Sequence, residues 1–102
     1  MKEDYSKYVG RHVFIVCSHD GETVCRYVGK VSKLDRWGNP ILEGIIKFSS
    51  NKLCFKENGS IYPWKIKTIS SAEYMAVLAA YKKHEQMRVK INKIFNEYHK
   101  NL

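Results

Sequence analysis

Several aromatic residues of this chain have Lys or Arg close by in the sequence, and this pairing is its clearest chemical pattern. The aromatics are Tyr27, Trp37, Tyr62 and Trp64. The nearby cations are Arg26, Lys30, Lys33, Arg36, Lys65 and Lys67. Bases of single-stranded nucleic acid stack on aromatic rings while cations bind the phosphates, so the pattern predicts a nucleic-acid-binding surface. Trp37 is the sharpest candidate because it falls in a turn; the alternatives are a Trp37 that plugs the end of the fold and a Trp64 that belongs to the core.

Catalytic and metal-binding motifs are missing from the sequence. It has no glycine-rich phosphate loop, no G-x-S-x-G and no H-E-x-x-H, and its four histidines lack metal-ligand spacing. Asp20-Gly21 predicts a two-residue turn that would pair His19 with Glu22 and put Cys17 and Cys25 on opposite faces of a hairpin. We therefore expect no enzyme activity, no cofactor and no metal. The three cysteines, the third being Cys54, are expected to be reduced thiols of a cytoplasmic protein.

Length and charge define the general class of the protein. The 102 residues predict a single domain, residues 1–102, and no apolar run approaches the ~20 residues that cross a membrane. Lys and Arg number 18 against 10 Asp and Glu, a formal net charge of +8. This balance favours RNA or another polyanion as partner. The alternative is an ordinary lysine-rich protein, because net charge bears on association and not on fold.

The chain reads as mainly β up to about residue 70. A short helical segment at 1–10 precedes five predicted strands at 12–17, 23–34, 41–48, 53–56 and 61–69. Asn58-Gly59 predicts a hairpin turn, and Gly29 predicts a bend or close backbone approach inside the second strand. Short strands with regular turns favour a five-stranded small β-barrel at 11–70. The first strand is apolar on both faces, so it needs a cover on each side.

The C-terminal third predicts a long amphipathic α-helix at 71–100. Ser70 and Glu73 form a capping box, and no Gly or Pro follows. An apolar stripe along its second half comprises Met87, Ile91, Ile94, Phe95 and Tyr98. A narrow stripe predicts either a partner interface, with a second copy or another protein, or a helix that folds back on its own barrel. Both alternatives stay open at this point.

Residues 8–70 resemble the Sm-like family of small-barrel RNA-binding proteins. The segment Tyr8-Val9-Gly10-Arg11-His12-Val13 is similar to the family's step from a short helix into strand one. The segment from Gly29 to Leu42 keeps the spacing of the first signature: glycine, apolar at +2, then apolar-Asp-x-aromatic-x-Asn-x-apolar-Leu. The segment 61–69 is similar to the last strands of the bacterial RNA chaperones in that family. The Arg-Gly or Lys-His pair of the second signature is replaced here by Pro63-Trp64.

The resemblance implies a function and a role for each site residue. Trp37 would stack on a base of single-stranded RNA, Asn39 would bind the edge of that base, and Asp35 would orient Asn39. Phosphate contacts are expected from Lys33, Arg36, Lys65 and Lys67. The family also implies a homo-oligomeric ring. The alternative function is a small protein-binding adaptor or inhibitor, possibly of phage type, that acts through the barrel surface and the C-terminal helix.

Overall fold

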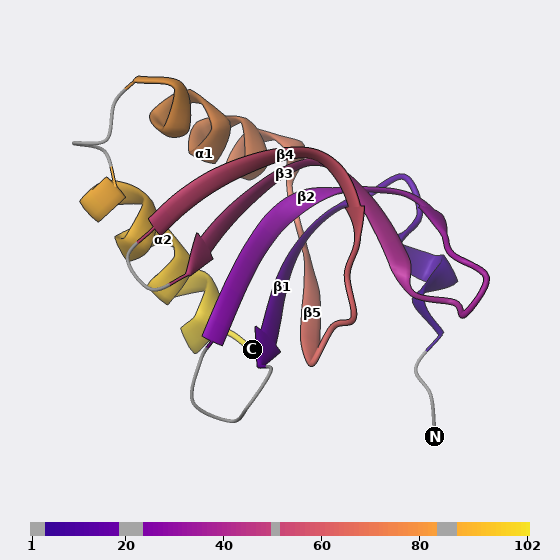
Figure 1. The fold of residues 1–102 in the computed structure, drawn as a ribbon. Helices are drawn as coiled ribbons and strands as arrows, with labels where there is room; N and C mark the ends of the chain where they lie inside the picture. Colours follow the sequence, from indigo (N-terminus) through magenta and orange to yellow (C-terminus); the bar gives the residue numbers. More distant parts are fainter. Residues whose placement is uncertain (1–3, 19–23, 50–51, 84–87) are drawn as a thin grey trace.

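The fold is one antiparallel sheet followed by two helices. The computed structural model describes residues 4–18, 24–49, 52–83 and 88–102. A short 3-10 helix, η1 (Tyr5–Tyr8), comes first. The strands are β1 (His12–Ser18), β2 (Val24–Leu34), β3 (Pro40–Ser49), β4 (Lys52–Ser60) and β5 (Lys65–Ile69). The helices are α1 (Ser71–Lys83) and α2 (Arg88–Lys100), as Figure 1 shows.

The five strands form a single curved sheet in the order β4-β3-β2-β1-β5. Every neighbouring pair is antiparallel. The predicted mainly β class with five antiparallel strands is confirmed. Within the described residues β4 and β5 do not pair with each other, so the sheet has two edges and is not closed.

Two predictions about strand pairing differ from the structure. Cys17 lies directly opposite Cys25, and not opposite Val24, so the two thiols share one face of the sheet and the predicted register is wrong. Residues 19–23, which include Asp20-Gly21, lie outside the described residues. Asn58 and Gly59 are not a hairpin turn but lie inside β4, because β3 continues alongside and supplies paired backbone. Long-range strand pairing overrides the local turn preference there.

Gly29 has the structural role that its position predicts. A Cβ at this residue would lie 3.0 Å from the Leu42 side chain and 3.2 Å from the Glu43 carbonyl oxygen. The β2–β3 register shifts between Val28 and Lys30, around this glycine. The expected bend and close backbone approach are confirmed, and together they let β2 curve across the fold.

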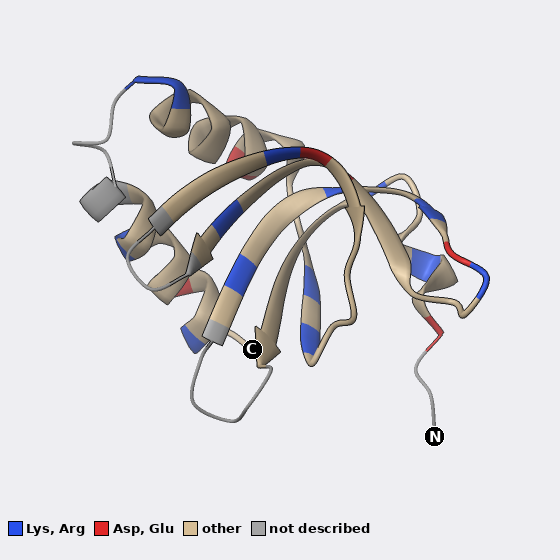
Figure 2. Cartoon of the chain, in the orientation of Figure 1, with Lys and Arg blue, Asp and Glu red and all other residues tan. Residues whose placement is uncertain are grey.

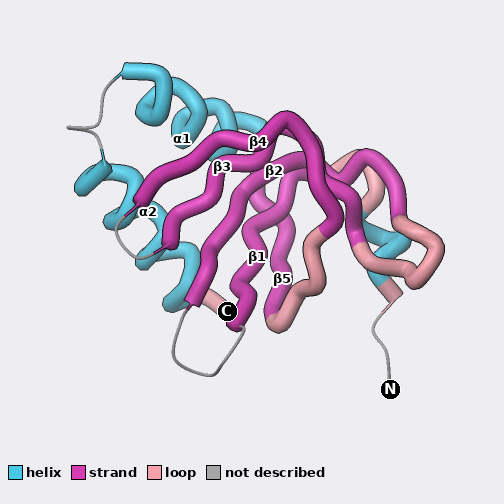
Figure 3. Tube along the Cα trace, in the orientation of Figure 1, coloured by secondary structure: helices cyan, strands magenta, loops and turns pink. Residues whose placement is uncertain are grey.

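One face of the sheet, called the helix face below, is covered by both helices (Figure 3). Ser70 caps α1 as predicted: its Oγ accepts from the Glu73 N–H at 3.0 Å, and its own N–H donates to Glu73 Oε1 at 2.9 Å. The core on this face consists of Phe14, Val16, Val28, Ile46, Phe48, Ile69, Tyr74, Val77, Ala80, Ile91, Phe95 and Tyr98.

The C-terminal region corrects the prediction of one long helix and favours one of the two alternatives for its apolar stripe. Two helices stand in place of the single long one, and α2 packs on the chain's own sheet. Ile91 and Phe95 are fully buried and Tyr98 nearly so, while Ile94 is partly buried against the same core. This stripe is therefore not an exposed partner interface; burial on Phe14 and Phe48 stabilises the folded-back arrangement. Met87 lies outside the described residues.

The opposite side of the sheet, called the open face below, has a lighter cover. Its core consists of Tyr5, Tyr8, Val13, Ile15, Cys17, Cys25, Tyr27, Val31, Leu42 and Ile45. The cover comes from η1 and from the irregular segment 61–64 between β4 and β5, which contributes Ile61. The prediction that the first strand is apolar on both sides and covered twice is confirmed.

Candidate nucleic-acid interface

The loop between β2 and β3 is organised by one carboxylate, that of Asp35. Its Oδ1 accepts hydrogen bonds from the backbone N–H groups of Trp37 and Asn39, each at 2.9 Å. Its Oδ2 accepts from the hydroxyl of Ser60 at 2.6 Å. The turn closes with Gly38, whose φ of 85° favours glycine. Asp35 therefore fixes the backbone on both sides of Trp37 and ties the loop to the end of β4.

Trp37 is presented to solvent by this loop. Its side chain is 61% exposed, so the alternative that it plugs the end of the fold is wrong. The guanidinium of Arg36 lies 4.2 Å from the centroid of the Trp37 ring. A cation at this distance is attracted to the ring face and adds positive charge beside it. An exposed ring with a cation beside it has the groups that base stacking next to a phosphate contact requires.

Asn39 carries an unusual polar atom. Its Oδ1 is buried and has no hydrogen-bond partner among the described residues. A buried acceptor without a donor costs roughly 1–3 kcal/mol. The structure thus brings Asp35, Trp37 and Asn39 together in one loop and leaves the buried amide oxygen of Asn39 without a donor among the described residues.

The predicted phosphate contacts fall into two separate groups. Lys33 is exposed near the end of β2 and Arg36 is exposed in the loop. Lys65 and Lys67 lie on β5, opposite Val16 and Phe14, and Figure 2 shows these cations on a different part of the molecule from the loop. Val16, the partner of Lys65, also pairs with Arg26 on β2. Along β2, Arg26 lies eight residues, about 25 Å, from Leu34 at the edge of the loop.

A second group of exposed aromatics lies beside Lys65. Tyr62 is 76% and Trp64 is 62% exposed, so the prediction that Trp64 belongs to the core is wrong. Pro63 between them is buried, and the chain is fixed at both sides: the Cys17 thiol donates to the Tyr62 carbonyl at 3.1 Å, and the Trp64 N–H donates to the Val16 carbonyl at 2.9 Å. Proline inside a predicted strand was the signal for this irregular segment.

Charge accompanies the rings in this second group. The Lys65 ammonium lies 5.2 Å from the Trp64 ring, whereas Lys67 reaches the ring of buried Tyr98 at 5.1 Å. Four residues from Ser60 to Trp64 span at most about 14 Å. Because Ser60 is bonded to Asp35, the segment 61–64 physically connects the loop with Trp64.

Arg26 is a cation whose role sequence reasoning missed. Its guanidinium donates to the side-chain oxygens of Asn96 and Asn92, at 2.5 and 2.7 Å. It also lies 5.1 Å from the Phe48 ring. Arg26 therefore fastens α2 to the helix face and is engaged within the fold. The pairs it makes lie 66 and 70 residues apart in sequence, so no local pattern indicates them.

The cysteines are all free, with Cys17 and Cys25 buried and Cys54 exposed. Burial raises the pKa of the Cys17 thiol to about 11, so this thiol stays protonated at neutral pH. Among the described residues no group of three or more His, Cys, Asp or Glu side chains is placed to hold a metal ion. In the part of the chain that the structure describes, no helix has both the length and the apolar character to cross a membrane.

The chain matches no protein-family model, and no curated protein sequence matches it. The candidate site therefore rests on two exposed groups of aromatic and cationic side chains. One is organised by Asp35 around Trp37, and the other is fixed by β1 around Trp64.

Proposed function

We propose that this chain is a non-catalytic single-stranded RNA-binding protein of Sm-like type. The observation that carries the proposal is the loop in which Asp35 holds the backbone of Trp37 and Asn39, with the Trp37 ring exposed and Arg36 against it. A flat exposed ring, an amide and a guanidinium within five residues supply stacking, base-edge recognition and phosphate binding.

The role that we propose for each residue of the loop follows from its contacts. A base stacks on the ring of Trp37, and Arg36 contacts an adjoining phosphate. Asn39 turns its amide outward, so that its oxygen accepts an N–H of the base edge; uracil offers such a donor beside two carbonyl acceptors. Asp35 is a positioning residue: it touches no base but keeps Trp37 and Asn39 at fixed distance.

In this proposal the remaining cations raise the affinity for RNA and do not select a base. Lys33 extends the basic surface on the β2 side of the loop. Lys65 lies with Trp64 at the far end of the segment 61–64 and would take the strand onward, and Lys67 follows on the same strand. Contacts of this kind weaken as salt rises, because binding releases counterions from the phosphates. The net charge of +8 favours the same partner.

The Sm-like assignment and the homo-oligomer belong to the same proposal. The strand order places β4 and β5 at the two edges of one curved sheet, each with one side unpaired within the described residues. Unpaired edges are a template for pairing with another chain. A ring in which β4 of one copy pairs with β5 of the next satisfies both edges and repeats the Trp37 loop around the assembly.

The experiment is oligonucleotide binding by the full chain and matched variants, measured by fluorescence anisotropy with a labelled oligouridylate. We expect Trp37→Ala to weaken binding by about 1–3 kcal/mol, roughly 5- to 150-fold. Met75→Ala is the control, because Met75 is 56% exposed on α1 away from the loop, and it should leave affinity unchanged. Equal affinity of the Trp37 variant and the natural chain contradicts the stacking role; absence of any salt-sensitive binding contradicts the function.

A further inference from the structure

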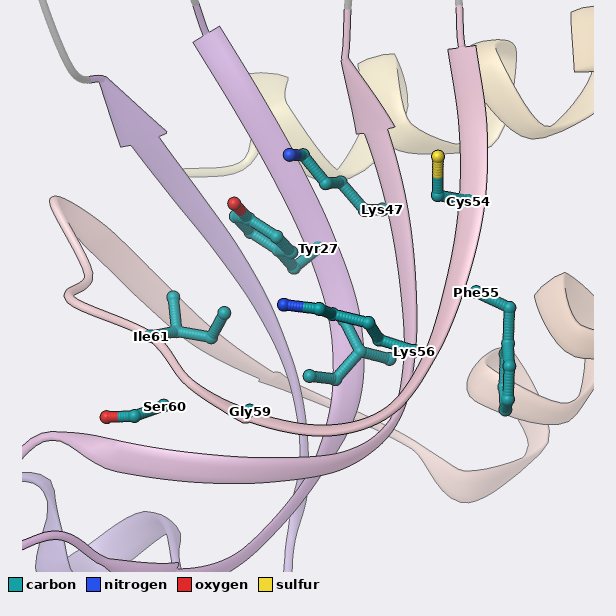
Figure 4. Close-up of a pocket in the computed structure, with 9 residues that line it drawn as sticks. Tyr27, Lys47, Cys54, Phe55, Lys56, Gly59, Ser60 and Ile61 are labelled. Carbon is teal, nitrogen blue, oxygen red and sulfur yellow. The ribbon is translucent and has the colours of Figure 1, made fainter.

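A cavity of about 340 Å³ lies on the open face, over β3 and β4. It adjoins the start of the segment 61–64 but does not include Trp37, Asn39 or Asp35. The lining residues are Tyr27, Ile45, Lys47, Cys54, Phe55, Lys56, Gly59, Ser60 and Ile61. In Figure 4, the ammonium ends of Lys47 and Lys56 extend from the sheet toward the side where Tyr27 and Ile61 lie, while the Phe55 ring points away toward a helix.

The strand register explains why two cations meet here. Lys47 lies directly opposite Cys54, and Ile45 lies directly opposite Lys56. These four side chains form a square on one face, with the lysines on its diagonal. Diagonal neighbours in an antiparallel pair have Cβ atoms about 7–8 Å apart, a distance that two lysine side chains bridge around one anion. No carboxylate is among the described residues that line the cavity, so none of these residues neutralises the pair.

The other side chains of the cavity are apolar or neutral. Ile45 is buried beneath it and Ile61 forms its rim. Desolvation by burial raises the pKa of the Tyr27 hydroxyl to about 12, so this hydroxyl is neutral at physiological pH. The Lys47 ammonium lies 5.9 Å from the Tyr27 ring. The cavity thus combines a doubly cationic end with an apolar wall.

We propose that this cavity binds a small organic phosphate: a phosphate ester that carries one ring-sized apolar group, about the size of a mononucleotide. A phosphomonoester carries close to two negative charges at neutral pH, which matches two ammonium groups. A carboxylate would leave one ammonium without a counter-charge. The volume lies at the lower end of the range for small-molecule pockets, about 300–1,000 Å³, so one nucleotide and not a longer segment fits.

This cavity is a separate site from the Trp37 loop of the proposed function. The same chemistry has two sources: a free mononucleotide, or the phosphorylated end of an RNA strand. Neither source requires stacking on Trp37. The site therefore has its own readout, and either proposal can fail without the other.

The reactivity of Cys54 can report whether the cavity is occupied, because Cys54 lines the cavity and is exposed while Cys17 and Cys25 are buried. The experiment measures the rate of Cys54 alkylation by iodoacetamide, using mass spectrometry of the full chain. We expect millimolar uridine monophosphate to slow the alkylation several-fold and in a saturable way, and uridine without its phosphate to have no effect. Oligouridylates with and without a terminal phosphate distinguish the two sources.

Charge-removing variants make the test specific. Each of Lys47→Gln and Lys56→Gln should raise the half-protecting concentration by about ten-fold, as expected for loss of one charged hydrogen-bond donor. Lys82→Gln on α1 removes the same charge from an exposed site elsewhere and should change nothing. Protection is compared within each variant, and circular dichroism checks folding. Equal protection by uridine, no protection at all, or protection that survives both lysine variants overturns the proposal.

Discussion

The two faces of the sheet are covered by very different amounts of chain. Two helices of 13 residues each cover the helix face, and its core closes around Phe14 and Phe95. Among the described residues, η1 and the segment 61–64 are the cover of the open face, which keeps a cavity, two lysines and an exposed thiol. Strands that are apolar on both sides need two covers, and here the second is incomplete.

This difference separates the side chains that stabilise the sheet from those that we propose to bind RNA. Side chains between sheet and helices are buried and contribute mainly through apolar contact and packing. The exposed rings of Tyr62 and Trp64 and the Trp37 loop lie where the chain leaves the regular strands, and exposed aromatics add little to the core. We therefore expect substitutions on the helix face to change the free energy of unfolding, and substitutions of the exposed rings to change binding.

The largest effect is expected from Phe95→Ala on the helix face. Phe95 is fully buried and contacts the rings of Phe14, Phe48 and Tyr98. Removing a buried Phe leaves a cavity and costs about 3–5 kcal/mol of unfolding free energy. Urea denaturation checks this, with Trp64→Ala as the comparison that stays within about 0.5 kcal/mol. Similar losses for both variants would contradict the contrast between the faces.

The next effect concerns the contact between Gly44 of β3 and Tyr74 of α1. Gly44 has a φ of 63°, a Cβ there would lie 2.5 Å from the Tyr74 hydroxyl, and that hydroxyl donates to the Gly44 carbonyl. We expect Gly44→Ala to lower the unfolding free energy by about 2–3 kcal/mol, from backbone strain and the lost hydrogen bond together.

A double-mutant cycle separates these two causes. Tyr74→Phe alone removes only the hydrogen bond and should cost about 0.5–1.5 kcal/mol. In the Tyr74→Phe background, Gly44→Ala should cost less than in the natural chain, because the clashing oxygen is gone. Strict additivity in thermal or urea unfolding would show that the hydroxyl contact does not restrict Gly44.

A smaller effect on stability, with a clear effect on binding, is expected from Asp35→Ala. The substitution removes the acceptor of the Trp37 and Asn39 N–H groups and of the Ser60 hydroxyl. Exposed loop hydrogen bonds contribute little, so unfolding free energy should fall by about 1 kcal/mol. Oligouridylate affinity should fall as well, because Trp37 is no longer held. Ser60→Ala removes one of the three bonds and should give a milder loss in both measurements; unchanged affinity in both variants would exclude a positioning role for Asp35.

Local patterns predicted much of this fold. The five strands, the capping box of Ser70 and Glu73, and the bend at Gly29 follow from propensity and short-range chemistry. Local patterns do not predict the Cys17–Cys25 register, the continuation of β4 through Gly59 or the packing of α2 on the chain's own sheet. Each of these depends on pairing or packing with residues far away in sequence, which a local turn or helix pattern does not contain.

The candidate site was predicted in part for the same reason. Asp35, Trp37 and Asn39 lie within five residues, so a single loop necessarily brings them together. Lys65 and Lys67 were grouped with them because they lie near Tyr62 and Trp64 in the sequence, and the sheet places both lysines on β5, within the strand predicted at 61–69. The cavity between β3 and β4 has no sequence pattern, because its cations Lys47 and Lys56 become neighbours only through the strand register.

The smallest expected effect is a pH dependence at the edge of the helix face. Burial lowers the pKa of His12, the positive charge of Lys30 lowers it further, and Glu43 opposes both. The His12 ring also stacks on Tyr74, with centroids 4.6 Å apart. The unfolded chain then takes up a proton near the ordinary value of about 6.5, before the folded chain does, so this contribution to stability is present above that pH and is lost as pH falls.

The test compares the natural chain with His12→Gln by urea denaturation between pH 7.5 and 5.5. Carboxylates contribute to both curves, so the quantity that matters is the difference between them. The natural chain should lose more unfolding free energy on acidification than the His12→Gln variant. Lys30→Met, made in the natural chain, should make this extra loss smaller, because it removes one cause of the lowered pKa of His12. Parallel curves would mean that His12 titrates alike in both states, and that the helix face, although buried beneath the helices, is open to water at its His12 edge.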